Sequence, residues 1–108
     1  MINVTRGEEL TVELALDVPS GQLESLTVNA VQGGVPVLRR EKADAKAGAD
    51  ERQVYFVFTG EETRRFRAGV PAFIQARGTL HGGIVTRSNV EELCVADVLG
   101  MGEERPWN

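Results

Sequence analysis

The sequence predicts an all-β domain, an immunoglobulin-like antiparallel β-sandwich of about seven or eight short strands with one short helix. Two observations lead to this prediction. Apolar and polar side chains alternate with a period of two in several segments, and turns containing Gly, Pro or Ser separate the segments roughly every eight to twelve residues. The chain has 108 residues, of which 42% are hydrophobic, and this suits a single core. A small antiparallel barrel is the alternative architecture.

The first part of the chain contains three of these segments. Residues 2–4 are expected to form a short first strand. In residues 10–16, Leu and Val alternate with more polar side chains, which is typical of a half-buried antiparallel strand. The "VPSGQ" turn signal follows, and residues 23–32 then repeat the alternation.

A hairpin is expected next. Gly33 and Gly34 supply the positive φ angles that a tight turn needs, and residues 35–40 return as the partner strand. Because Pro36 has no N–H, this strand is expected at a sheet edge. Residues 40–51 are rich in charge and alanine, so we expect a mobile loop there.

The strongest strand signal is "RQVYFVFT", in the middle of the chain. Val54, Phe56 and Phe58 lie on one face of the expected strand, and Tyr55 and Val57 lie on the other. Apolar side chains on both faces indicate a central strand. Its back would be covered by a loop, another chain or a second layer.

The segment "FTGEETRRFRAG" is predicted to be a structural connector, not a catalytic or binding loop. Thr59, followed three residues later by Glu62, is the pattern of a capping box at a helix N-terminus. The helix is expected over residues 60–67, about two turns, with three arginines in the last turn, where the helix dipole favours positive charge. Phe66 docks this helix on the core, and Gly69 is placed to end it in a left-handed conformation.

The last part of the chain is predicted to form a hairpin and a closing strand. Residues 70–80 and 82–90 pair around the "HGG" turn. In the closing strand, residues 91–99, Leu93 and Val95 lie on one face. The opposite face carries Cys94, Ala96 and Val98.

One domain is expected over residues 1–99, followed by an extended or disordered tail over residues 100–108. The tail contains an isolated Trp107, which either packs back onto the domain or anchors a partner. The apolar back faces of the two strands and this tryptophan supply the candidate protein-interaction residues. These are Tyr55, Val57, Cys94, Ala96, Val98 and Trp107. Because such faces need covering, we expect a homo-oligomer.

Composition argues against several classes of function. The formal net charge is −4 and the pI is about 5.0, which argues against nucleic acid as the main partner. The first ten residues lack the pattern of a signal peptide, and the apolar runs are far shorter than the roughly 18 residues of a membrane span. A single cysteine excludes an intrachain disulfide. We therefore expect synthesis in the cytoplasm and no contact with a membrane.

No residue is assigned a catalytic, cofactor-binding or metal-binding role, and the chain is not expected to be an enzyme. The single histidine, His81, is expected at an exposed hairpin tip. Cys94 is expected to be buried in a core strand, where a thiolate is disfavoured. A zinc site needs three or four ligands, and the acids at 44, 50 and 51 do not have the spacing of a calcium-binding EF-hand loop.

The order of these segments resembles small structural proteins of tailed-phage and prophage modules of gut Firmicutes, including the N-terminal domain of baseplate upper proteins. The resemblance covers most of the chain and is clearest over residues 58–99. Pro71 and the loop over residues 39–51 depart from the pattern. The matching positions are Glu61, Glu62 and Thr63, then Gly69, Gln75, Arg77 and Ser88, and finally residues 95–99.

The resemblance implies a β-sandwich and a non-enzymatic virion, tail or baseplate protein that acts through protein–protein interaction. Other phage structural proteins would be its partners, and the protein would be associated with the virion. The resemblance brings no catalytic residue with it. The alternative is a carbohydrate-binding or host-surface recognition module, which would need exposed aromatic side chains. The chain has one Tyr and one Trp for that purpose, Tyr55 and Trp107.

Overall fold

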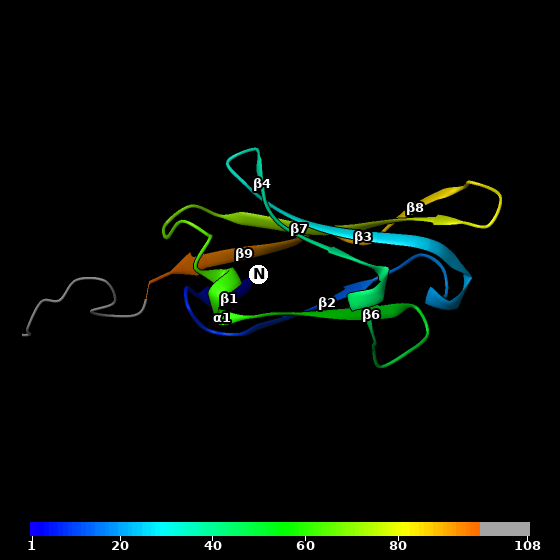
Figure 1. The fold of residues 1–108 in the computed structure, drawn as a ribbon, viewed down its shortest axis with the longest axis horizontal. Coiled ribbons are helices and arrows are strands. Elements are labelled where there is room, and N and C mark those ends of the chain that lie inside the picture. Colours follow the sequence, from blue (N-terminus) through cyan, green and yellow to red (C-terminus); the bar gives the residue numbers. More distant parts are fainter. Residues whose placement is uncertain (98–108) are drawn as a thin grey trace, which may run out of the picture.

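The structure is a computed structural model, and it describes residues 1–97. Two β-sheets pack face to face with the core between them, as the two layers in Figure 1 show. The larger sheet consists of β1 Ile2–Thr5, β3 Leu23–Gln32, β4 Val35–Glu41, β7 Ala72–Leu80, β8 Val85–Arg87 and β9 Glu91–Ala96. The smaller sheet consists of β2 Leu10–Ala15, β5 Lys46–Ala47 and β6 Gln53–Phe58. The helical segments are η1 Ser20–Gln22, η2 Lys42–Asp44 and α1 Gly60–Thr63.

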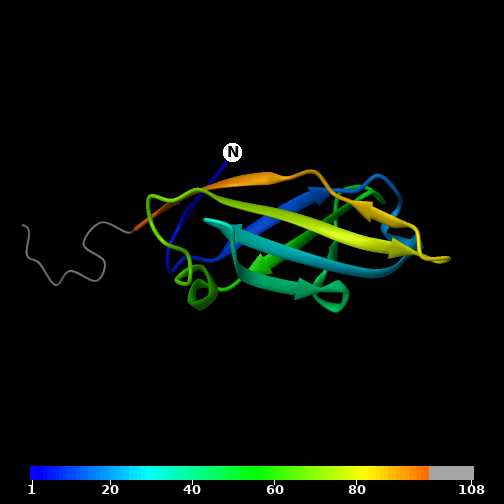
Figure 2. The ribbon, with the colours of Figure 1, turned by 90° about the horizontal axis from the view of Figure 1, so that it is seen from above.

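The strand order confirms the predicted immunoglobulin-like sandwich. The large sheet has the order β1-β9-β7-β3-β4, with β8 paired to β7, and the small sheet has the order β2-β6-β5. Immunoglobulin folds divide their strands in the same way, with strands B, E and D in one sheet and strands C, F and G in the other. Here β2, β6 and β5 take the places of B, E and D, and β3, β7 and β9 take those of C, F and G. The pair β1–β9 is parallel, and the other strand pairs are antiparallel. Figure 2 shows the strands of the large sheet crossing over β2 and β6.

All eight strands expected from the sequence are present, and β5 is a ninth. As expected, β4 lies at a sheet edge, and β6 is the central strand of its sheet. The expectation for residues 40–51 was wrong, because this segment contains η2 and β5. Glu41 and Asp44 form a capping box on η2, and β5 pairs with β6 through Lys46 and Ala47.

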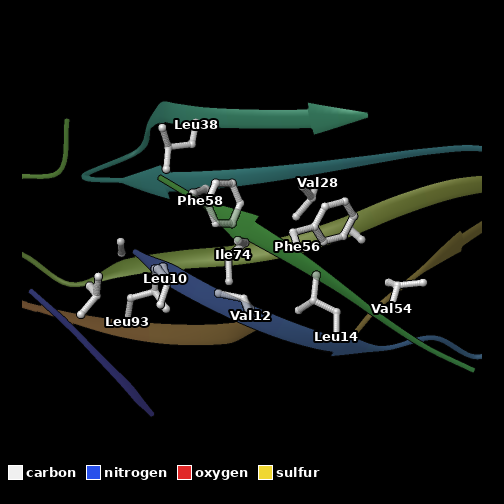
Figure 3. Close-up of a cluster of buried hydrophobic side chains, with 14 of the residues drawn as sticks. Leu10, Val12, Leu14, Val28, Leu38, Val54, Phe56, Phe58, Ile74 and Leu93 are labelled. Atoms are coloured by element: carbon white, nitrogen blue, oxygen red, sulfur yellow. The ribbon is translucent and has the colours of Figure 1, made fainter. Parts of the chain in front are cut away.

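The core consists of the inward-facing residues that the alternation selects. Figure 3 shows Phe56 and Phe58 of β6 lying among Val12, Leu14, Val28 and Ile74 from both sheets. Phe56, Val12, Leu14 and Val28 are completely buried. Since each strand contributes every second residue to this layer, the outward residues are left to form two separate outer faces.

The helix in the connector after β6 is shorter than predicted. Its capping box is confirmed, because Thr59 Oγ1 accepts a hydrogen bond from the Glu62 N–H at 3.2 Å and the Glu62 carboxylate accepts one from the Thr59 N–H at 2.9 Å. However, α1 ends at Thr63 after one turn, so the three arginines lie beyond it. The chain turns away at this point because Phe66 enters the core, where it is 1% exposed. Gly69 has a φ of 80°, but it lies past the helix end, and its N–H donates to the Val95 carbonyl.

The predicted domain extends to residue 99, so its last two residues lie outside the described residues, together with the tail from 100 to 108. Within residues 1–97, no helix has the length and apolar character needed to cross a membrane.

Candidate interaction surfaces

The predicted interaction residues do not form one surface. Tyr55 and Val57 lie on the outer face of the small sheet, and both are half-buried. Cys94 and Ala96 lie on the outer face of the large sheet, and both are exposed. The two pairs are therefore on opposite sides of the sandwich. The other two predicted residues, Val98 and Trp107, lie outside the described residues.

The prediction that Cys94 is buried was wrong. Leu93 and Val95 occupy the inward positions of β9, at 0% and 4% exposed, so the alternation turns Cys94 outward. The residue beside it in register is Asn3 of β1, the edge strand of the sheet, which leaves the thiol accessible. A free thiol here lies on the surface of the domain and makes no contribution to its core.

His81 is exposed at a hairpin tip, as predicted. Its side chain is 77% exposed, and its Nδ1 lies 3.4 Å from a carboxylate oxygen of Glu24. It follows Leu80 at the end of β7, whereas β9, which carries Cys94, pairs with the beginning of β7. The histidine and the cysteine are thus separated along the large sheet. Within residues 1–97, no group of three His, Cys, Asp or Glu side chains is arranged to hold a metal ion.

The large sheet, not the small one, carries the exposed apolar side chains. Apart from Met1, the exposed large hydrophobic residues of the described chain belong to strands of the large sheet or to the segments that join them. These residues are Val35, Phe73, Ile84, Val85 and Val90, between 45% and 63% exposed. They were not predicted from the sequence, although the alternation that identified Tyr55 as an outward residue also places Phe73 on an outer face.

A cleft of about 300 Å³ lies on the same outer face, across β3, β4, β7 and β8. Hydroxyl and amide side chains form its floor, and the Ser25 and Thr79 hydroxyls are hydrogen-bonded at 2.6 Å. Two arginines border it. Its lining residues are Ser25, Thr27, Asn29, Arg39, Arg77, Gly78, Thr79 and Val85.

The two arginines of the cleft differ in their partners. Arg39 forms an ion pair with Glu41 on its own strand at 3.1 Å, and the same carboxylate accepts a hydrogen bond from the Thr27 hydroxyl. Arg77 lies directly opposite Arg87 in the β7–β8 register. Within residues 1–97, neither Arg77 nor Arg87 forms an ion pair. A pair of like charges therefore lies side by side at the edge of the cleft.

The connector, by contrast, uses its polar groups internally. The buried Gln32 amide donates to the carbonyls of Arg67 and Val70 at 2.7 Å and accepts from the Arg67 N–H at 2.7 Å. The Thr63 hydroxyl donates to the Glu8 carbonyl and accepts from the Gly7 N–H. These bonds tie the connector to β3 and to the turn before β2. The interpretation of this segment as structural fits its geometry.

The pKa of the Glu62 carboxyl is shifted by its surroundings. Burial raises this pKa. Hydrogen bonds from the Thr59 N–H and the Arg40 guanidinium, together with the Arg40 charge, lower it by a larger amount, so the net pKa lies below the ordinary value of 4.5. Arg40 also lies over the Phe58 ring, 5.4 Å from its centre. The ionised Glu62 thus joins α1 to β4 of the large sheet.

No protein-family model matches the chain, and no curated protein is significantly similar to it. Among solved structures, the chain is similar to the crystal structure of an engineered protein from the Northeast Structural Genomics Consortium, with a TM-score of 0.56 and 18% sequence identity. The alignment covers 88% of this chain and 18% of that one, so this chain spans less than a fifth of that protein's length. At this level of identity, the likeness shows the fold alone.

Proposed function

We propose that this domain is a non-enzymatic structural module that acts through protein–protein contacts in the virion, tail or baseplate of a phage or prophage. The resemblance over residues 58–99 supports the phage context. The observation that supports the contact function is the one-sided distribution of exposed apolar side chains. Those of the described chain other than Met1 gather on the large sheet and its connections.

An exposed aromatic residue on a sheet surface is the kind of side chain that anchors protein interfaces. Phe73 is 45% exposed and lies near one end of the β3–β7 pairing, between Glu92 of β9 and Val31 of β3. On the edge strand β4, Pro36 is the residue opposite Val31 and continues this row. Covering a side chain such as Phe73 in an interface contributes about 1.5–3 kcal/mol when burial is complete.

Sedimentation velocity of the wild type and of two variants tests the contact function. Phe73→Ser removes the aromatic side chain from the large-sheet face, and Tyr55→Ser is the matched control on the small-sheet face. We expect the wild type and Tyr55→Ser to form a defined oligomer, and Phe73→Ser to sediment as a monomer. A wild-type protein that stays monomeric at high concentration would refute the homo-oligomer, and oligomers unaffected by Phe73→Ser would refute the choice of face.

The phage context has its own test. Particles induced from a host that carries the gene are purified, and the protein is measured in them by mass spectrometry. We expect it in a fixed ratio to the tail proteins. Recovery of the protein in the soluble fraction only, with none in the particles, would contradict the proposal.

The carbohydrate-binding alternative has less support from the described residues. Tyr55 is half-buried between neighbouring strands, and the cleft on the large sheet is lined by no aromatic side chain. Phe73 is the one exposed aromatic side chain within residues 1–97, and it lies outside the lining of the cleft. Sugar rings bind by stacking on such side chains. A glycan array with the wild-type protein distinguishes the two functions, since a structural contact module gives no specific signal on it.

A further inference from the structure

The most unusual feature of the large-sheet face is the pair formed by Arg77 and Arg87. Their Cα positions are directly opposite each other in the β7–β8 register, and both side chains are exposed. Like charges in directly opposite strand positions are destabilising. The chain as a whole carries more acids than bases, 16 against 12, yet within residues 1–97 neither arginine is neutralised by an ion pair. The register therefore places two like charges opposite each other on the outer face of the large sheet.

The surroundings of the pair are suited to an anionic group. Arg77 borders the cleft of about 300 Å³, whose floor presents the hydroxyls of Ser25, Thr27 and Thr79. Two acids lie close by in register. Glu41, opposite Thr27, is already engaged by Arg39 and by the Thr27 hydroxyl. Asp17 adjoins the Leu16–Ser88 bridge and therefore lies beside Arg87, but the two form no ion pair within residues 1–97. Neither guanidinium of the Arg77–Arg87 pair has an ion-pair partner in the described part of the chain, and one hydroxyl of the hydrogen-bonded Ser25–Thr79 pair keeps its proton for a ligand, so the site is electropositive.

We propose that this cleft binds the carboxylate side chains of an acidic segment in a protein partner. A guanidinium holds a carboxylate through two parallel hydrogen bonds, so two adjacent arginines can donate to two acidic side chains at alternate positions (i and i+2) of an extended chain, which point to the same side. The bound carboxylates also remove the repulsion between Arg77 and Arg87. The inference rests on the proposed contact function, and it adds the chemistry of the partner.

A protein partner is favoured over an acidic polysaccharide by the composition of the cleft. None of its lining residues is aromatic, so a sugar ring has no platform on which to stack, whereas Val85 and the nearby Ile84 offer apolar contact to aliphatic side chains. The cleft also lies in the same face as Phe73, so an apolar anchor and acidic side chains of one partner would engage one surface.

Isothermal titration calorimetry with an octaglutamate peptide tests the site. The variant R77Q/R87Q removes both charges of the pair. The matched control R64Q/R65Q removes two exposed arginines from the connector and so changes the net charge equally. We expect the Kd of the peptide to rise by at least about tenfold in R77Q/R87Q and by less than about twofold in R64Q/R65Q. Thermal melts establish that both variants fold, and R77Q/R87Q is expected to melt no lower than the wild type, because it relieves a repulsion.

Three outcomes would overturn the inference. These are no measurable binding of octaglutamate to the wild type, equal affinity for the wild type and R77Q/R87Q, or tighter binding of hyaluronate than of the peptide through the same two arginines. The last result would assign the site to an acidic polysaccharide. Each is separable from the contact function itself, because oligomers that depend on Phe73 would persist in the sedimentation experiment whatever the peptide does.

Discussion

The two outer faces of the sandwich obey the same alternation and yet differ in what they expose. On the large sheet, Phe73 and Arg77 of β7 point outward and are exposed. On the small sheet, Tyr55 and Val57 occupy the equivalent outward positions of β6 and are half-buried. An outward apolar residue is thus not by itself an available surface. What covers it is decided by the neighbouring strands.

The neighbours of Tyr55 account for its cover. Glu13 of β2 and Lys46 of β5 lie opposite it in register, one on either side, and long charged side chains in such positions cover apolar neighbours with their aliphatic stems. Phe73 has Glu92 of β9 on one side and the shorter Val31 of β3 on the other. The next strand, β4, only begins at this level, with Val35 and Pro36. The outward apolar side chains of the small sheet are therefore less exposed to solvent than Phe73 on the large sheet.

The largest expected effect separates the inside of β6 from its outside. Phe56→Ala removes a completely buried ring, so it should lower the free energy of unfolding by about 3–5 kcal/mol. Tyr55→Ala, on the same strand but facing outward, should lower it by about 1 kcal/mol or less. Urea titrations of both variants measure the difference. Equal losses would mean that the small-sheet face is a second core, and the comparison of the two faces would fail.

The next effect concerns the link between the sheets at α1. Glu62→Gln keeps an acceptor for the Thr59 N–H but loses the charge that Arg40 contacts, so it should lower the free energy of unfolding at pH 7 by about 1–2 kcal/mol. The pKa of Glu62 is lower in the folded protein than its ordinary value of 4.5. Its contribution is therefore complete above pH 4.5 and is lost as the pH falls through the folded pKa.

Urea titrations of the wild type and Glu62→Gln between pH 7 and pH 3 check this dependence. The two stabilities should converge as the pH falls, because protonation removes the same charge that the substitution removes. A constant difference over the whole range would show that the ionised carboxylate does not join α1 to the large sheet.

A smaller loss is expected at the beginning of α1. Thr59→Ala removes the hydroxyl that accepts from the Glu62 N–H, so it should lower the free energy of unfolding by about 1 kcal/mol. Thr59→Ser retains the oxygen and serves as the control, with little change expected. Equal losses in the two variants would indicate that the β-branched side chain matters here and the cap does not.

Much of the fold could be predicted from the sequence because local pattern determines it. Alternation located eight of the nine strands, and Gly33 and Gly34 marked a hairpin in which both residues have positive φ. The strand β5 was missed because two residues carry too little pattern, and it exists only through pairing with β6. The length of α1 was overestimated because its end depends on the burial of Phe66 and on the bonds from Gln32, which is distant in sequence.

The candidate surface was harder to predict, for the same reason. The outward position of Tyr55 could be inferred from its own strand, but the residues that lie opposite it, Glu13 and Lys46, depend on strand order. The opposition of Arg77 and Arg87 likewise depends on the register of a hairpin, which a loop of four residues between β7 and β8 does not fix on its own. The sequence predicts which side chains point outward, but the pairing of the strands determines which of them are neighbours.

The smallest expected effect has the opposite sign and tests the openness of the large-sheet face. Arg87→Thr places a β-branched residue in the strand and removes one of two opposed positive charges, so it should raise the free energy of unfolding by about 0.2–1 kcal/mol. Arg39→Thr on the same face is the control. Because Arg39 has an acidic partner in Glu41, its loss should bring no gain. The gain from Arg87→Thr should shrink at high salt, where exposed charges are screened. A loss of stability in urea would mean that Arg87 makes a favourable contact within the domain. The Arg77–Arg87 pair would then be no evidence for an anionic partner.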